Sequence, residues 1–201
     1  MRMLLAGASG LVGGLVLGLC RDAIPITRRP IGRPGVVADF DDLPPLPEAQ
    51  VAVCALGTTR AKAGSDSAFR AVDHDAVLAF ARAAKAAGVA HFILVSSIGA
   101  NPKANLLYPR TKGEVEAALA GMGFTRLDIL QPGLLIGPRA ERRPVERFLQ
   151  WAAPVMDLVL PRDLGSLPAG AVAGAILALT ICNEPGVFRH TNRAIASLTL
   201  T

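Results

Sequence analysis

The chain has 201 residues, of which 51% are apolar and 18% are charged, so it is long and apolar enough to form a folded domain with a buried core. Its net charge is +5, but its most basic stretch, residues 139–147, also contains glutamates and a proline, and aromatic residues make up only 4% of the chain. This pattern argues against a disordered chain and against a nucleic-acid partner.

The three cysteines, Cys20, Cys54 and Cys182, are odd in number and far apart, so they match neither a disulfide framework nor a metal-binding spacing. We therefore expect free thiols in a reducing, cytoplasmic location and no metal site. The uncharged stretch 4–20 resembles a signal peptide or a membrane span, but it is rich in glycine and at the short limit for crossing a bilayer. A strand, a glycine turn and a helix explain it better, and we expect no membrane partner.

Strand-like and helix-like segments alternate along the chain, which predicts an α/β fold with a single Rossmann-like, doubly wound parallel sheet in the strand order 3-2-1-4-5-6. Three prolines within 41–50 exclude a regular helix there. We expect one domain over 1–201, with a short substrate-side region at about 140–201. The expected strands are 3–6, 23–27, 36–39, 51–56, 91–95, 124–130 and 187–190, and the expected helices are 11–21, 67–87, 109–119, 144–160 (broken at Pro154) and 169–181.

The first strand is followed by a glycine turn with the spacing GxxGxxG. Gly7 and Gly10 permit a tight turn and a close approach of a pyrophosphate, and Gly13 lets the helix pack against the sheet. The free amides and the positive end of the helix dipole favour phosphate groups. We expect a dinucleotide to be bound by Gly7, Ser9, Gly10, Leu11, Val12 and Gly13; the alternative is a tight turn without a ligand.

Arg28 and Arg29 end the second strand, where folds that select NAD place an acidic residue. Arginine at this position suits the 2′-phosphate of NADP through bidentate hydrogen bonds. The sequence therefore favours NADP over NAD, although the pair could also be a solvated surface feature. Asp39 ends the third strand and is a candidate acceptor for the adenine amino group, or a cap for the segment that follows.

Tyr108 and Lys112 form a YxxxK pair on one expected helical face. A nearby ammonium favours the phenolate form of a tyrosine, which makes the pair suitable for proton transfer. Ser96 and Ser97 end the fifth strand, and either hydroxyl could bind a substrate carbonyl. The alternative is a surface tyrosine beside a solvated lysine.

The motifs GASGLVG, strand-end SS and YxxxK resemble, in this order, those of the short-chain dehydrogenase/reductase superfamily. The stretches CALGTTRAKAG, FRAVDHD, HFILVSSIGA and YPRTKGEVEA are similar to its atypical branch, which is related to the mammalian Tat-interacting protein. The resemblance implies a catalytic set of Ser97, Tyr108 and Lys112, with Lys112 also contacting the cofactor. It further implies that the cofactor is lined by the glycine turn and by Arg28, Arg29, Leu56, Gly57, Thr58, Pro132 and Gly133.

Three features depart from the family pattern: Gln131 stands where an arginine is common, the connections around the third strand are short, and the region after about residue 140 is brief. The sequence predicts an NADP(H)-dependent oxidoreductase that acts on a small carbonyl or alcohol, as a monomer or homodimer. The alternative is a non-catalytic, NADPH-binding regulatory protein; a scaffold without a ligand fits the glycine turn poorly.

Overall fold

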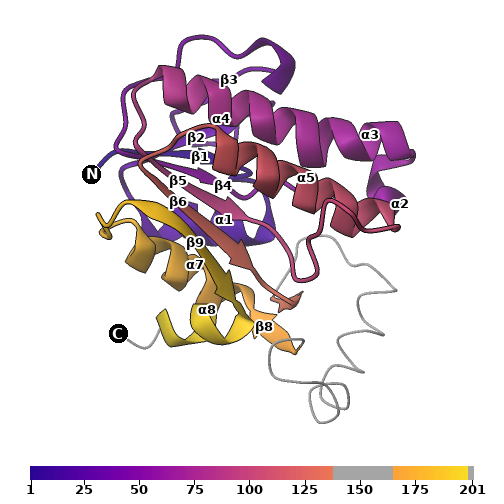
Figure 1. Cartoon of the computed structure of the whole chain (residues 1–201). Coiled ribbons are helices and arrows are strands. Elements are labelled where there is room, and N and C mark those ends of the chain that lie inside the picture. Colours follow the sequence, from indigo (N-terminus) through magenta and orange to yellow (C-terminus); the bar gives the residue numbers. More distant parts are fainter. Residues whose placement is uncertain (138–164, 199–201) are drawn as a thin grey trace.

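The computed structural model describes residues 1–137 and 165–198, so the helix expected at 144–160 lies outside the described residues. Within the described part, seven parallel strands form one sheet in the order β3-β2-β1-β4-β5-β6-β9 (Figure 1). This order confirms the predicted Rossmann-like topology. The strands are β1 (Met3–Ala6), β2 (Ala23–Thr27), β3 (Val36–Val37), β4 (Val51–Cys54), β5 (His91–Val95), β6 (Arg126–Gln131) and β9 (Gly186–Thr191).

The central strands consist mainly of apolar residues because both faces of the sheet are covered. On one face, Leu4 and Phe92 pack with helices α4 (Ala76–Ala86) and α5 (Leu107–Gly121). On the other face, Leu5 and Ile93 pack with α1 (Leu11–Leu19), α7 (Ala169–Leu179) and the short α8 (Asn192–Leu198). Figure 1 shows α4 and α5 on one side of the sheet, and α7 and α8 on the other.

The connection between β2 and β4 contains a single short helical turn, the 3₁₀ helix η1 (Phe40–Asp42), as the prolines predicted. Phe40 from this turn packs edge-on against Phe80 of α4, with the ring centroids 6.5 Å apart. On the other face, the guanidinium of Arg33 donates hydrogen bonds to the carbonyl groups of Leu17, Cys20 and Arg21 at the end of α1. Phe40 and Arg33 thus attach this short connection to α4 and to the end of α1.

The helix expected at 67–87 begins earlier and is interrupted. It consists of α2 (Arg60–Ala63), α3 (Asp66–Arg70), a π-helical turn η2 (Ala71–Asp75) and α4. The hydroxyl of Ser65 accepts a hydrogen bond from the amide of Ala68 and caps the start of α3. Periodicity alone did not reveal the π turn, because the extra residue per turn changes the helical spacing only locally.

Other boundaries also differ from the expected ones. The strands expected at 36–39 and 51–56 end earlier, at Val37 and Cys54. The next residue of each, Ala38 and Ala55, still donates its amide to the neighbouring strand, at Thr27 and Ala6, but the paired register stops there. The expected helix 109–119 begins at Leu107, and three short elements were missed: β7 (Leu134–Ile136), β8 (Ser166–Pro168) and α8. The first two form a separate two-stranded parallel sheet whose partners are about 30 residues apart, so local periodicity does not indicate it.

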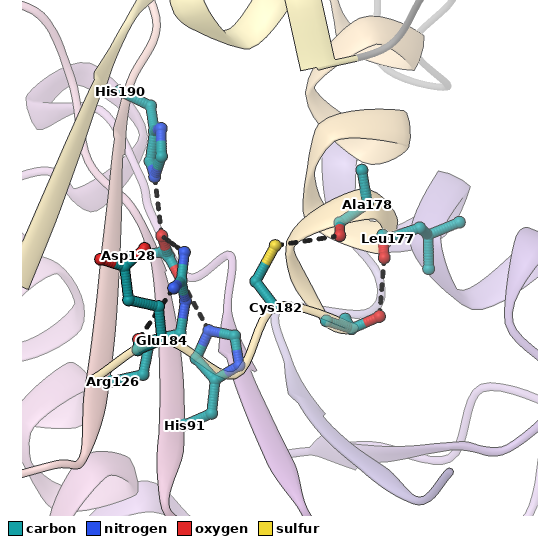
Figure 2. Close-up of polar contacts among 9 residues, drawn as sticks. His91, Arg126, Asp128, Leu177, Ala178, Cys182, Glu184 and His190 are labelled. Atoms are coloured by element: carbon teal, nitrogen blue, oxygen red, sulfur yellow. Dashed lines mark hydrogen bonds and ion pairs between the residues drawn. The ribbon is translucent and has the colours of Figure 1, made fainter. Parts of the chain in front are cut away.

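Strand β9 lies beside β6 and is joined to it by a buried charge cluster (Figure 2). Asp128 of β6 is fully buried. Its carboxylate accepts hydrogen bonds from Nε2 of His91 at 2.7 Å, from Nε2 of His190 at 2.7 Å, and from Nε and Nη2 of Arg126 at 2.6 and 2.9 Å. Burial by itself would raise the pKa of Asp128, but these donors outweigh it and hold the pKa well below its usual range.

Arg126 extends the cluster to the turn before β9. Its Nη1 atom donates to the carbonyl oxygen of Glu184 at 2.9 Å, and its guanidinium lies 4.2 Å from the centroid of the Phe188 ring. The cluster therefore connects β5, β6 and β9 through side chains as well as through the sheet's backbone hydrogen bonds.

Candidate functional site

The glycine turn packs directly onto the end of β4. Gly7 has a φ of +85°, and a Cβ atom there would lie 2.4 Å from the carbonyl carbon of Ala55. A Cβ atom at Gly13 would lie 2.1 Å from the carbonyl oxygen of Gly7. Both positions therefore require glycine, and the first turn of α1 sits as close to the sheet as backbone atoms allow.

The start of α1 offers unpaired backbone donors. The amides of Leu11, Val12 and Gly13 precede the first intrahelical bond, in which Gly14 N donates to Gly10 O at 2.8 Å. No side chain caps this end, no acidic residue lies in the first turn, and Ser9 and Gly10 are exposed. These features fit the pyrophosphate of a dinucleotide, because the amides and the positive end of the helix dipole face an open surface.

Arg28 and Arg29 are exposed at the end of β2, the strand that pairs with β1. The hydroxyl of Thr27 donates to the carbonyl oxygen of Arg29 at 2.9 Å and shapes this turn. Neither arginine forms an ion pair with any residue that the structure describes, so both guanidinium groups are available to an anion. Asp39 is also exposed; its backbone carbonyl accepts a hydrogen bond from Asp42, and its side chain makes no capping contact.

Lys112 lies buried at the carboxyl end of β4. Its Nζ atom forms an ion pair with Oδ1 of the fully buried Asp73 at 2.8 Å. Oδ2 of Asp73 accepts a hydrogen bond from the amide of Thr58 at 2.7 Å, and a Cβ atom at Gly57 would lie 3.8 Å from the lysine Nζ. Burial would lower the pKa of Lys112, but Asp73, together with Tyr108, holds that pKa above its ordinary value.

Asp73 was not expected from the sequence. A signal for it exists in the spacing of the buried positions: Asp73 lies four residues after Phe69 and four before Val77, and both of these are buried. A carboxylate on the buried face of a helix needs a charged or hydrogen-bonding partner, which the fold supplies from α5.

Tyr108 lies at the N-terminal end of α5, one helical turn before Lys112. Its ring packs against the ring of Phe69, with the centroids 5.9 Å apart and the planes tilted by 39°. The side chain remains 44% exposed, so it is accessible to a small molecule.

The two serines at the end of β5 have different partners, although both are buried. Ser96 Oγ donates to Oε1 of Glu116 at 2.5 Å. Ser97 Oγ is buried and has no hydrogen-bond partner among the described residues. An unpaired buried hydroxyl is costly unless a ligand satisfies it, which favours Ser97 as the substrate-facing residue.

Glu116 was not expected from the sequence, and it is the partner of Gln131, the residue that departs from the family pattern. Gln131 Nε2 donates to both carboxylate oxygens of Glu116, at 3.0 and 3.1 Å. Arg189 of β9 then supplies a positive charge, with its Nε atom 3.5 Å from Oε2 of Glu116. Glu116 is therefore contacted from α5's neighbours by Ser96, Gln131 and Arg189.

Pro132 and Gly133 connect β6 to the segment that follows it. The carbonyl oxygen of Pro132 accepts from the amide of Ile98 at 2.9 Å, and the amide of Gly133 donates to Oδ1 of Asn192 at 2.8 Å. Asn192 Nδ2 in turn donates to the carbonyl oxygen of Gly165 at 2.7 Å. This backbone segment is therefore held between the end of β5 and the start of α8.

The structure brings three of the predicted groups together: the glycine turn, the 56–58 segment and Lys112. The two arginines lie at the end of the next strand, whereas Asp39 lies farther out, beyond the short β3. In the described ranges, no group of His, Cys, Asp and Glu side chains is arranged to hold a metal ion. Within the same ranges, no helix has the length and apolarity needed to cross a bilayer.

Comparisons with curated proteins give several related sequences, although no family model matches the chain. The chain is 41% identical over 150 residues to protein HTATIP2 of Rattus norvegicus, a match that covers 72% of this chain and 57% of that protein. It is 42% identical over 122 residues to protein fmp52, mitochondrial, of Emericella nidulans, covering 61% of this chain and 52% of that protein. These matches thus span about half the length of the relatives.

A third relative is covered more completely. Protein FMP52, mitochondrial, of Lodderomyces elongisporus is 33% identical over 201 aligned residues, which cover 82% of this chain and 84% of that protein. Because the names of the FMP52 relatives place them in mitochondria, the cytoplasmic location expected from the sequence stays a prediction.

Solved structures of low sequence identity share the fold. MoeE5 in complex with UDP-glucose and NAD matches with a TM-score of 0.72 at 17% identity, covering 99% of this chain and 81% of that chain. Human epimerase family protein SDR39U1 with NADPH matches with a TM-score of 0.69 at 18% identity, covering 98% of this chain and 80% of that chain. RMD from Pseudomonas aeruginosa, complexed with NADPH, matches with a TM-score of 0.65 at 19% identity, covering 95% and 78%.

Proposed function

Because this chain belongs to the family of the HTATIP2 and FMP52 proteins, an atypical branch of the short-chain dehydrogenases/reductases, we propose that it is an NADP(H)-dependent oxidoreductase acting on a small carbonyl or alcohol. The observation that carries the proposal is the position of Lys112. Its ammonium is buried beside Gly57, just after the carboxyl end of β4, and the glycine turn packs against the same end of that strand. A cofactor held by the turn would therefore pass close to the YxxxK pair.

Binding of the cofactor rests on two groups of donors. The open amides at the start of α1 would hold the pyrophosphate, and the unpaired guanidinium groups of Arg28 and Arg29 would hold the 2′-phosphate. This arrangement supports NADP(H) over NAD(H). The structural neighbours themselves include complexes with NADPH and with NAD.

In the reaction, the bound nicotinamide supplies or accepts the hydride. The Tyr108 hydroxyl would donate a proton to the carbonyl oxygen during reduction, or accept one from the alcohol during oxidation. Lys112 would hold the cofactor ribose. Ser97 would donate its hydroxyl, which has no partner among the described residues, to the same carbonyl oxygen.

A binding assay followed by a turnover assay tests the proposal. Calorimetry with NADPH and NADH measures affinity, and the absorbance of reduced nicotinamide measures turnover with a panel of aldehydes and ketones. Ser97→Ala should lower turnover at unchanged melting temperature, whereas Ser96→Ala should lower the melting temperature because Glu116 loses a partner. A folded protein that binds neither cofactor contradicts the proposal.

A second candidate function is that of an NADPH-binding regulatory protein without turnover. The observation that favours it is that the Lys112 ammonium is already paired with Asp73 at 2.8 Å, while the Tyr108 ring packs against Phe69. Tight NADPH binding without turnover of any carbonyl in the panel, together with unchanged binding in Tyr108→Phe, supports this candidate over the enzyme.

A further inference from the structure

Two helices meet through matched pairs of side chains. Phe69 and Asp73 are four residues apart on α3 and η2, and Tyr108 and Lys112 are four residues apart on α5. Phe69 packs on Tyr108, with the ring centroids 5.9 Å apart, and Asp73 pairs with Lys112 at 2.8 Å. The whole YxxxK pair is therefore contacted by one face of a neighbouring helix.

The Asp73–Lys112 pair is fully desolvated and carries no net charge. The side chain of Lys112 is 5% exposed and that of Asp73 is 0% exposed. A buried ammonium without its partner would be strongly destabilised, and its positive charge would act on every nearby group with little screening. The pair is also anchored to the 56–58 segment, because the amide of Thr58 donates to the second carboxylate oxygen.

This neutrality matters for a nicotinamide cofactor, because the oxidised ring carries a positive charge and the reduced ring carries none. We propose that Asp73 is a positioning residue that holds the Lys112 ammonium and cancels its charge, so that the site accepts the oxidised as well as the reduced nicotinamide. The proposal rests on the proposed binding of NADP(H), but not on the identity of the substrate or on turnover.

Removing each charge in turn should shift the cofactor preference in opposite directions. Asp73→Asn leaves a bare ammonium, which repels the positively charged ring of oxidised NADP. The dissociation constant of oxidised NADP divided by that of reduced NADP should therefore rise by about tenfold. Lys112→Met leaves a bare carboxylate and should lower the same ratio. Lys112→Met also removes a contact to the ribose, but this loss affects both redox forms equally and cancels in the ratio.

The experiment measures the affinity of both redox forms by calorimetry for the wild type, both single variants and the double variant. It is run at several pH values between about 6 and 8, because burial lowers the pKa of a lysine that has lost its partner and the ammonium is retained best at the acidic end. The double variant has neither charge and should return to the wild-type ratio. Asp75→Asn is a matched control on the same helical turn, because the Asp75 side chain is 60% exposed and contacts His74. It should leave the ratio unchanged.

Opposite shifts in the two single variants, restored in the double variant, support the proposal. An unchanged ratio in both, or an equal loss of both redox forms without a change in ratio, overturns it and assigns Asp73 to packing alone. If Asp73→Asn does not fold, the Lys112→Met and double variants still decide, because they must differ from each other in the ratio. A wild-type protein that binds neither form contradicts the proposed function instead.

Discussion

Replacing Asp128 by asparagine should destabilise the protein strongly. The carboxylate is fully buried and accepts hydrogen bonds from His91, Arg126 and His190. Asparagine keeps one acceptor oxygen but leaves the charge of Arg126 uncompensated, and the Arg126 side chain is only 7% exposed. Breaking a buried pair in this way costs about 3–5 kcal/mol, which lowers the melting temperature of a domain of this size by roughly 10 °C or more.

The effect should depend on pH with a defined sign. Because the folded-state pKa of Asp128 lies well below its value in an unfolded chain, its contribution is fully present above the ordinary aspartate range. That contribution is lost as the pH falls below about 4 towards the folded-state pKa. The melting temperatures of wild type and Asp128→Asn should therefore converge on acidification.

Thermal unfolding followed by circular dichroism at several pH values measures both quantities. Asp22→Asn is the control, because Asp22 pairs with the N-terminal amine at the surface and its side chain is 62% exposed. Its removal should change the stability by less than about 0.5 kcal/mol. Equal melting temperatures for the two variants, or a difference that stays constant down to low pH, would refute the role assigned to the cluster.

Three further predictions concern the candidate site. NADPH should bind at least about tenfold more tightly than NADH, and replacing Arg28 and Arg29 together by alanine should remove the preference while leaving NADH affinity nearly unchanged, as measured by calorimetry. Tyr108→Phe should abolish turnover while NADPH affinity stays within a few-fold, since proton transfer contributes about 10²–10⁴ in rate; turnover by the variant at the wild-type rate contradicts this role. Gly13→Ala should weaken NADPH binding and lower the free energy of unfolding by about 1–3 kcal/mol, because its Cβ atom would lie 2.1 Å from a backbone oxygen. Gly18→Ala is the control: its Cβ atom would meet no atom within 4 Å, so the variant should be neutral or stabilising in urea unfolding.

Local patterns in the sequence were sufficient for the topology. The aliphatic strands and their alternation with helices predicted the Rossmann-like sheet, and the three prolines predicted the absence of a regular helix within 41–50; the structure confirms both. These features could be predicted because they depend on the period of a strand or helix and on the geometry of single residues. The glycine turn belongs to the same class, since Gly7 and Gly13 are required by backbone contacts within the first strand–turn–helix unit and the adjacent strand.

The sequence by itself determined the fold class, the glycine turn and the YxxxK pair. Only the tertiary structure decided which groups meet in and around the site: Asp73 as the partner of Lys112, and Glu116 as the partner of Ser96 and of Arg189. Each of these contacts joins residues from different helices or strands, and the energy of a buried charge or hydroxyl depends on what lies across that interface. Periodicity records which face of an element is buried, but the identity of the group that meets it is set by the packing of elements far apart in the chain.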